Sequence, residues 1–410
     1  MRGNTSLTEQ RSHVQRHVVI VDPDNGERLD DALCSVMRAP RSYTGEDVVE
    51  LSCHGSPPLL RALLERLIAQ GARLAAPGEF TRRAFLNGRL DLAQAEAVAL
   101  LISARTERAA MLAARGVGGE LGRRLRAVRE RVLDLVAGLE VTLDFPEEGV
   151  GTEPADAASA IQLLVADVAS LRESARRGRL VHDGVTVALV GAPNAGKSSL
   201  LNALVGRERA IVSPVAGTTR DVIEATIDLD GIPIRLLDTA GLGSPRDAVE
   251  AEGIRRSRAA IDESDLLLVV IDGHRPVPAA VLEETAHRPR LVVRSKSDLA
   301  ADATTSLLTD AVAFSAMTGA GLAELTQRVA EVVRARADAG GELMASVRQI
   351  DGLEALERAL VAAQQAMKDA PVEVSLVDLR EALTQVSALL GIDVGDAVLD
   401  RIFSTFCLGK

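Results

Sequence analysis

The sequence predicts a multidomain protein of the α/β and all-α classes, in which an α/β domain is inserted into a discontinuous helical domain. Three observations favour this organisation. Apolar runs alternate with helical stretches between residues 185 and 337, which is typical of a parallel sheet with covered faces. Helical apolar periodicity precedes residue 183 and returns after residue 338. Short strand-like runs near the N-terminus indicate a smaller α+β domain.

Length and composition agree with several packed domains. The chain has 410 residues, and 47% of them are hydrophobic. At ~150 residues per domain, two or three domains are expected. With one Tyr, six Phe and no Trp, the core must be built from Ala, Leu and Val. The formal net charge of −11 argues against a large non-specific surface for nucleic acid.

The cysteines and the hydropathy pattern bear on the cellular environment. Cys34, Cys53 and Cys407 lie far apart and form no CxxC pair, so neither a zinc site nor a disulfide framework is indicated. The polar N-terminus lacks the apolar segment of a signal peptide. No run approaches the ~18 apolar residues that would cross a membrane. We therefore expect a soluble protein of the reducing cytoplasm.

Strand and helix patterns divide the chain into four segments. In the first, residues 1–88, HVVIVD (17–22) and VVELSC (48–53) read as strands, and Leu60, Leu63, Leu64 and Leu67 mark a helix that ends at Gly71. The second, residues 89–182, is predicted to be helical. Its apolar stripe comprises Leu121, Leu125, Val128, Val132, Leu133, Val136 and Leu139, and another helix follows over 155–177.

The α/β domain is predicted to span residues 183–338, and the second helical part residues 339–410. Strands are expected at 185–191, 232–238, 265–272, 290–296 and 311–316, with helices at 253–264 and 322–337. Beyond the α/β domain, apolar periodicity predicts helices over 350–367 and 375–391.

A phosphate-binding loop is the strongest functional signal. Residues 191–198 read GAPNAGKS between a predicted strand and a predicted helix. Small residues let backbone N–H groups wrap a phosphate chain, and the helix N-terminus adds positive potential. Lys197 is expected to reach the β- and γ-phosphates, and Ser198 to offer its hydroxyl to Mg²⁺.

Three further loops follow in the order that a GTP-binding protein requires. Asp238 ends a strand within DTAG (238–241) and can hold Mg²⁺ through water, while Gly241 can donate its N–H to the γ-phosphate. Asp298 in SKSD (295–298) can accept the N1–H and N2–H₂ groups of guanine. Backbone N–H groups of Ser315 and Ala316 are expected to close over the base.

The residues for hydrolysis are less sharply indicated. In GTTRD (217–221), either Thr218 or Thr219 can supply a hydroxyl to Mg²⁺. Leu242 stands where some GTPases carry a water-orienting Gln, so another device is needed. Asn194 can hold a monovalent cation beside the developing charge, or can stabilise its own loop. Carboxylates within 247–253 can position water, or can simply form a solvated face.

Motifs outside the α/β domain resemble the MnmE (TrmE) family of tRNA-modifying GTPases. They are SYTGEDVVELSCHGSP (42–57), PGEFTRRAFLNGRLDLAQAEAV (77–98), LDFPEE (143–148) and the terminal RIFSTFCLGK. The resemblance implies a P-loop GTPase domain inserted in a discontinuous helical domain, with an N-terminal α+β folate-binding-like domain. That domain is expected to be truncated, because the strand–helix segment with which the family begins has no counterpart in MRGNTSLTEQ.

The resemblance also implies cofactors, partners and residue roles. It implies that Asn194, the carbonyls of Ser213 and Val215, and Thr218 hold K⁺, while Ser198 and Thr219 take Mg²⁺ and Glu250 orients water. Glu50, Arg89 and Lys410 align with positions that contact a reduced folate. Partners implied are tRNA, an MnmG-like flavoprotein and a second copy through the G domains. The implied product is a 5-carboxymethylaminomethyl-type modification of the wobble uridine.

All the predicted GTP-binding residues lie in five loops or at their edges. They are Asn194, Ala195, Gly196, Lys197, Ser198, Ser199, Ser213, Pro214, Val215, Ala216, Gly217, Thr218, Thr219, Asp238, Thr239, Ala240, Gly241, Ser295, Lys296, Ser297, Asp298, Ser315, Ala316 and Met317. Ser295 stands where the usual motif begins with Asn.

Two other functions stay open. One is a GTP-regulated binding switch of the ribosome-assembly type, although no basic RNA-binding module follows the α/β domain. The other is a truncated GTPase without folate-dependent modification activity. Cys407 is interpreted as a packed helix residue rather than a reactive thiol. His54 is interpreted as a turn or strand-end residue.

Overall fold

The computed structural model describes residues 10–145, 147, 151–207, 209–210, 223–240, 248–305, 308–337, 343–392, 394–407 and 409. The chain divides into two compact units. The first comprises residues 1–99, 116–168 and 351–410, and the second residues 100–115 and 169–350. No helix of the described residues is long and apolar enough to cross a membrane.

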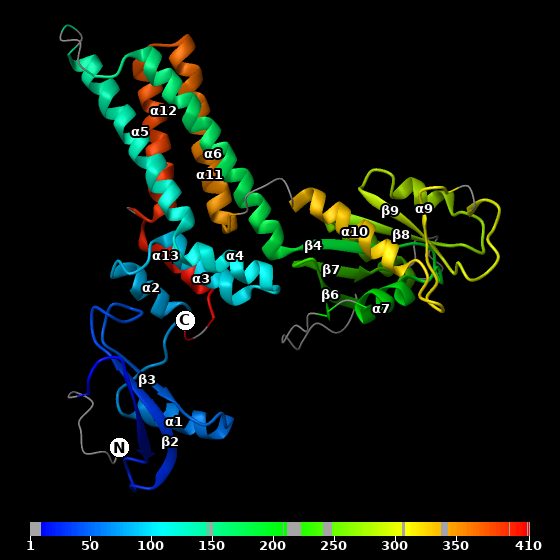
Figure 1. Cartoon of the computed structure of the whole chain (residues 1–410), viewed down its shortest axis with the longest axis horizontal. Helices are drawn as coiled ribbons and strands as arrows, with labels where there is room; N and C mark the ends of the chain where they lie inside the picture. Colours follow the sequence, from blue (N-terminus) through cyan, green and yellow to red (C-terminus); the bar gives the residue numbers. More distant parts are fainter. Residues whose placement is uncertain are drawn as a thin grey trace. The chain divides into compact units, whose positions relative to one another are not determined.

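The first unit joins a small sheet to a group of long helices (Figure 1). Strands β1 (Val14–Val21), β2 (Arg28–Met37) and β3 (Val48–Ser52) form an antiparallel sheet, followed by helix α1 (Pro57–Ala69). The remaining helices of this unit are α2 (Glu79–Leu86), α5 (Glu120–Asp144), α12 (Val372–Leu390) and α13 (Asp396–Ser404). Most of α3 (Leu92–Ser103), the first part of α6 (Pro154–Asp183) and most of α11 (Val347–Asp369) also belong to it.

Helices that are distant in sequence are fastened by polar contacts as well as by their apolar faces. Helix α5 buries Leu125, Val132 and Leu139 at helical spacing, and α12 buries a matching stripe. Arg380 of α12 donates to Glu140 of α5 at 2.6 Å. Arg82 of α2 pairs with Asp400 of α13 at 2.8 Å. The helical part before the α/β insertion therefore packs on the part after it, as the sequence predicts.

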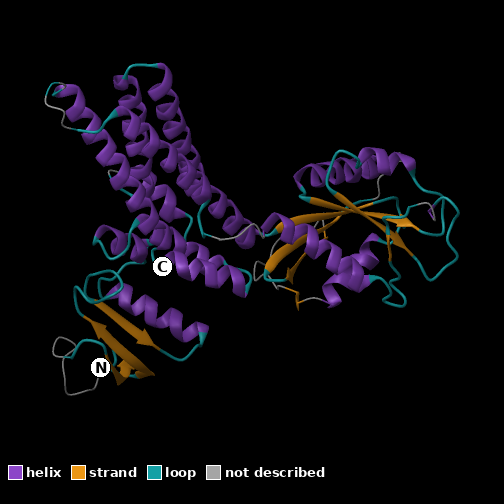
Figure 2. Cartoon of the chain, turned by 45° about the horizontal axis from the view of Figure 1, so that its top comes forward, coloured by secondary structure: helices purple, strands orange, loops and turns teal. Residues whose placement is uncertain are grey.

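The second unit is built on a seven-stranded mixed sheet with the order β10-β9-β8-β4-β7-β6-β5 (Figure 2). Strands β4 (Val185–Val190), β7 (Ile232–Asp238), β8 (Leu266–Asp272), β9 (Arg290–Ser295) and β10 (Val312–Ala313) run parallel. Strands β6 (Ile223–Leu229) and β5 (Arg209–Ala210) extend the sheet in antiparallel pairs.

Successive residues of the central strands point to opposite faces of the sheet and pack into two separate hydrophobic cores. In β4, Val187 and Leu189 pack on the face covered by α7 (Lys197–Arg207) and α10 (Leu322–Ala337). Ala188 and Val190 pack on the opposite face with α8 (Ala248–Glu263) and α9 (Ala279–Glu284). Burial on both faces explains the unbroken apolar runs. Helix α4 (Glu107–Val117) also belongs to this unit, through a cluster around Leu112 and Val181.

The predicted fold class is confirmed, whereas details of the elements differ. Strands β2, β5 and β6 were not predicted. Polar residues interrupt the apolar pattern of β2, and β5 has only two residues, whereas the regular alternation of IEATIDL in β6 is a strand signal that the prediction missed. Leu133, assigned to the buried stripe of α5, is 36% exposed, since it lies one position beyond Val132 and points away from the core. Helix α1 forms as predicted, but none of its residues is buried. The predicted domain limits stay predictions.

Candidate functional site

The phosphate loop occupies the turn between β4 and α7 in a strained but well-packed conformation. Asn194 and Gly196 have positive φ values of 62° and 98°. A side chain at Gly191 would collide with the carbonyl oxygen of Val270, so only glycine fits there. Asn194 is exposed, whereas Ala195 is 1% exposed. The loop therefore presents Asn194 outward and rests on the sheet through Ala195.

Lys197 is held inside the loop, at the first turn of α7. Its side chain is buried, and Nζ donates to the carbonyl oxygens of Gly191 and Ala192 at 3.2 Å each. Burial lowers the pKa of Lys197, and the negative charge of Asp238 partly opposes that shift. The Lys197 ammonium group therefore bonds only to neutral carbonyl oxygens of the loop, and negatively charged phosphate oxygens can replace them.

Ser198 and Asp238 form a pair of oxygens at the end of β7. The Ser198 hydroxyl donates to Asp238 Oδ2 at 2.6 Å. Asp238 Oδ1 is buried and has no hydrogen-bond partner among the described residues. Hydroxyl, carboxylate and water are the oxygen ligands that Mg²⁺ prefers. The donor set therefore fits Mg²⁺, either directly or through water, beside the phosphate loop.

The residues after Asp238 are anchored to neighbouring elements. Thr239 is buried, and its hydroxyl donates to the carbonyl of Leu189 in β4 at 2.7 Å. The carbonyl of Ala240 accepts from the Ser257 hydroxyl of α8 at 3.0 Å. Thr239 therefore has a structural role in placing Asp238, which sequence reasoning did not assign.

Two side-chain pairs involve the loops that are predicted to bind the base. The Ser315 hydroxyl donates to Asp298 Oδ1 at 2.6 Å, and this bond holds the pKa of Asp298 below its usual range. Lys296, at φ 55°, pairs with Asp272 at 2.6 Å. Asp298 is thus kept ionised and oriented, as an acceptor for guanine must be. Ser315 uses its own N–H on the carbonyl of Ala320, so its hydroxyl is the group that faces Asp298.

Three other residues predicted to bind GTP differ in exposure and in contacts. Ser199 is exposed on α7, Met317 is 85% exposed, and the N–H of Ser297 donates to the carbonyl of Phe314 at 3.1 Å. Asp272, the partner of Lys296, was not predicted as a residue of the site. Its position as an acidic residue at the carboxyl end of the buried strand LLLVVID is the signal that could have indicated it.

Part of the predicted site lies outside the described residues. This holds for Gly241, Leu242 and Lys410, and for the loop 213–219. Glu250 falls within α8, but only its backbone is described.

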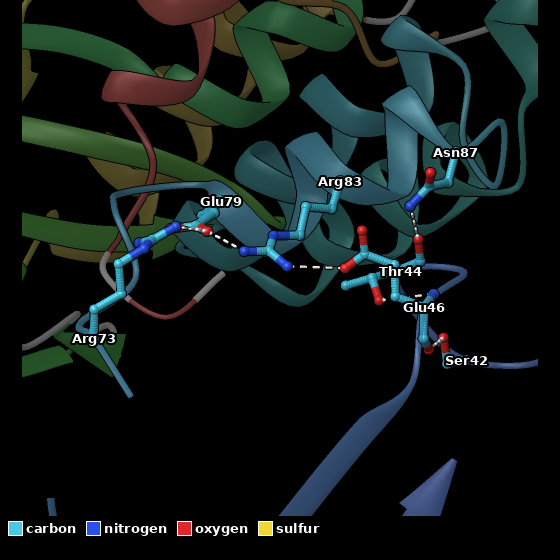
Figure 3. Close-up of polar contacts among 7 residues, drawn as sticks. All are labelled: Ser42, Thr44, Glu46, Arg73, Glu79, Arg83 and Asn87. Carbon is cyan, nitrogen blue, oxygen red and sulfur yellow. Dashed lines mark hydrogen bonds and ion pairs between the residues drawn. The ribbon is translucent and has the colours of Figure 1, made fainter. Parts of the chain in front are cut away.

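The residues aligned with folate contacts lie in the first unit. Glu50 is exposed on β3, where it pairs in register with Ser35. Arg89 follows α2 and packs against Gly45, whose missing side chain would come within 3.2 Å of it. Asn87 donates to the carbonyl of Thr44 at 2.8 Å (Figure 3). The loop before β3 is therefore attached to the end of α2.

A chain of alternating charges continues this attachment along α2 (Figure 3). Glu79 accepts two bonds from Arg73, at 2.5 and 2.8 Å, and one from Arg83 at 2.6 Å. Arg83 also donates to Glu46 at 2.9 Å. The Arg73 guanidinium, the N–H of Ala76 and Arg83 lower the pKa of Glu79 to about 2. Sequence reasoning noted the PGEFTRRAF motif but not this network.

Two minor assignments can be compared with the structure. His54 follows β3, and both its N–H and its Nδ1 contact the Asp30 carboxylate, at 2.9 and 2.7 Å. That position agrees with a strand-end residue. Cys407 is exposed and lies beyond the end of α13, so the interpretation as a packed helix residue is wrong. Helical periodicity failed there because the helix stops at Ser404.

Comparison with known proteins identifies relatives over nearly the whole chain. The MnmE helical domain family matches residues 92–407, and the family described as the GTP-binding protein TrmE N-terminus matches residues 2–89. The tRNA modification GTPase MnmE of Moorella thermoacetica is 44% identical over 98% of this chain and 91% of its own length. The Thermus thermophilus relative of the same name is 45% identical over 95% of this chain and 88% of its own.

Solved structures are similar to part of this chain. Era of Aquifex aeolicus, bound to GDP·AlF4⁻, covers 43% of this chain and 67% of its own, at 28% identity and a TM-score of 0.31. The G domain of the T. maritima FeoB iron transporter covers 36% of this chain and 97% of its own, at 30% identity and a TM-score of 0.28.

Proposed function

Because the chain belongs to the MnmE family of tRNA modification GTPases, we propose that it binds GTP with Mg²⁺ and hydrolyses GTP with the help of K⁺. We further propose that hydrolysis serves a 5-carboxymethylaminomethyl-type modification of the wobble uridine of tRNA in the cytoplasm. An MnmG-like flavoprotein would be the partner in that reaction. The G domains of two copies would pair while GTP is hydrolysed.

The observation that carries the GTPase proposal is the Ser198–Asp238 pair beside the phosphate loop. The Ser198 hydroxyl donates to one oxygen of the Asp238 carboxylate, and the other oxygen is buried with no hydrogen-bond partner among the described residues, so the pair can take a divalent cation as an additional partner. Bound Mg²⁺ would neutralise charge on the β- and γ-phosphates. Lys197 would exchange its two carbonyl contacts for phosphate oxygens, which restores a charged partner to a buried ammonium.

Recognition of guanine is assigned to Asp298. Its carboxylate accepts hydrogen bonds from the N1–H and N2–H₂ groups of the base. The hydrogen bond from the Ser315 hydroxyl holds the carboxylate in its orientation. Adenine offers no matching pair of donors, so the Asp298 carboxylate would lose water to the bound base without gaining hydrogen bonds in return. Backbone groups of the loop around Ala316 and Met317 would cover the base.

The hydrolysis step is proposed to depend on K⁺ and on Glu250. Asn194 is exposed at the turn of the phosphate loop, where its carboxamide oxygen is free to reach a cation near the leaving phosphate. The carbonyls of Ser213 and Val215, with Thr218, would complete that K⁺ site. Thr219 would join Ser198 on Mg²⁺. Glu250, in the first turn of α8, would orient the attacking water.

The salt dependence of GTP turnover tests this proposal. We expect turnover to be much faster in KCl than in NaCl at equal ionic strength, because the bare Na⁺ ion is smaller and costs more to dehydrate, so it does not replace K⁺ among the same oxygens. The Asn194→Ala variant should lose the difference. Equal rates in the two salts would remove the cation role from Asn194.

The role of Glu250 is tested by a pair of variants on one helix. Glu250→Ala should leave GTP affinity nearly intact and slow turnover by about 100-fold or more, the usual range for a residue that positions the reacting water. Glu252→Gln is the control, since its carboxylate is occupied by Arg255 and Arg256. Full turnover by Glu250→Ala would remove the assignment.

The folate proposal concerns Glu50, Arg89 and Lys410. We propose that these residues contact a reduced folate. Glu50 is exposed on β3, and Arg89 packs against Gly45 in the loop that precedes β3. Calorimetry with 5-formyltetrahydrofolate should show binding that Glu50→Gln weakens. A chain that hydrolyses GTP but shows no heat of folate binding would instead support a GTPase without folate-dependent modification activity.

A further inference from the structure

Ser295 is the last residue of β9, directly before Lys296–Asp298, which are called the base loop, and its side chain faces the phosphate loop (residues 191–198). The residue is 3% exposed. Its Oγ is 2.5 Å from the carbonyl oxygen of Ala195 in the phosphate loop and 3.1 Å from that of Ile271 in β8. A serine hydroxyl has one proton to donate. The shorter distance assigns this proton to Ala195, so the hydroxyl bonds to the phosphate loop and not to a ligand.

The backbones on either side of this bond are also in close contact. A Cβ atom at Gly196 would lie 3.4 Å from both Cβ and Oγ of Ser295, so the phosphate loop rests directly on the serine. The carbonyl of Ser295 accepts the N–H of Gly273 at 3.0 Å. Ser295 is therefore fixed from its backbone and its side chain, and neither group is exposed toward a base.

The usual motif has Asn at this position, and serine changes what the position can do. A carboxamide has two N–H donors and one acceptor, so it can hold one loop and still contact a second group. The single O–H of Ser295 is already committed to Ala195. The carboxylate of Asp298, oriented by Ser315, then has to recognise the base without help from Ser295.

We propose that Ser295 is a positioning residue that fastens the phosphate loop to the base loop, and that it makes no contact with guanine. This inference rests on the proposed binding of guanine nucleotides. Removal of the hydroxyl leaves the Ala195 carbonyl buried without this donor and loosens the phosphate loop. The affinity for any nucleotide that uses the phosphate loop falls as a result, whichever base it carries.

The experiment compares GDP with IDP, which lacks the 2-amino group that Asp298 recognises. Dissociation constants are measured by calorimetry for the wild type, Ser295→Ala and Ser295→Cys, and kcat for GTP is measured in parallel. The thiol has the same shape but is larger and donates weakly, so it fills the position without the hydroxyl's hydrogen bond and covers the case in which the alanine variant folds poorly. Ser264→Ala is the matched control. That serine is also buried and bonds locally to Ile261, but it precedes β8, at the opposite end from the nucleotide loops.

The expected result is an equal rise in the dissociation constants for GDP and IDP, about 3- to 10-fold for one buried neutral hydrogen bond. The preference for GDP over IDP stays that of the wild type, kcat falls, and Ser264→Ala changes nothing. A reduced preference for GDP in Ser295→Ala would show that Ser295 recognises the base and would overturn the inference. Wild-type affinity in both Ser295 variants would also overturn it. A wild-type chain that binds neither nucleotide would instead refute the proposed function itself.

Discussion

The charge network of α2 gives a quantitative prediction for the first unit (Figure 3). In Glu79→Gln, the two bonds from Arg73 and the bond from Arg83 lose their anionic acceptor. The pKa of Glu79 is lowered from 4.5 to about 2, which corresponds to a ceiling of ~3.4 kcal/mol of folding stability near neutral pH. The Arg73 and Arg83 side chains are 66% and 45% exposed, so solvent screens the interaction. We expect Glu79→Gln to cost roughly 1–2 kcal/mol.

The pH dependence of this cost has a defined sign. The folded-state pKa of Glu79 lies below its unfolded value, so its contribution is complete above about pH 4.5 and is lost as the pH falls toward about 2. The difference between the wild type and Glu79→Gln should therefore shrink to less than half by about pH 3.

Hydrogen exchange at the amide of Ala76 is the sharpest assay, because that N–H donates to the Glu79 carboxylate at 2.8 Å. It also isolates the first unit, which urea unfolding of a multidomain chain does not. Glu65→Gln, an exposed glutamate on α1, is the control. The reasoning is refuted if exchange at Ala76 changes equally in Glu79→Gln and Glu65→Gln. It is also refuted if the effect of Glu79→Gln is the same at about pH 3 as near neutral pH.

Two further predictions concern the second unit. Ser315→Ala should raise the pKa of Asp298 toward its usual value and weaken GTP binding by about 3- to 10-fold in a fluorescent-nucleotide titration, because the carboxylate loses the hydroxyl that orients it. An unchanged affinity would show that Asp298 needs no such support. Thr106→Val keeps the volume of a buried residue but removes a hydroxyl that donates to the carbonyl of Gly231 at 2.7 Å and accepts the N–H of Ala109. It should destabilise the second unit by about 1–3 kcal/mol, measured by hydrogen exchange in α4, and a cost under about 0.5 kcal/mol would contradict the role of this threonine.

Local chemistry made much of the nucleotide site predictable. A glycine-rich turn between a buried strand and a helix can be read directly from GAPNAGKS, and acidic residues at strand ends are visible in DTAG and SKSD. The same locality explains the helices: α10 spans Leu322–Ala337, the range that apolar periodicity predicts. Strand β6 was missed because it alternates apolar and polar residues, as a strand buried on one face does, and lacks the continuous apolar run of the central strands.

The sequence by itself determined the order of the nucleotide loops, the insertion of the α/β domain between helical segments, and the resemblance that led to the family. Each depends on residues that are close in the chain. Only the tertiary structure decided which oxygens meet: Ser198 with Asp238, Ser315 with Asp298, and Ser295 with the carbonyl of Ala195. Those partners are 17 to 100 residues apart in sequence, and parallel strand order brings their ends to one edge of the sheet. The spacing of residues along the chain does not reveal these contacts. The sequence therefore shows that Ser295 replaces the usual asparagine, but it does not show that Ser295 bonds to Ala195.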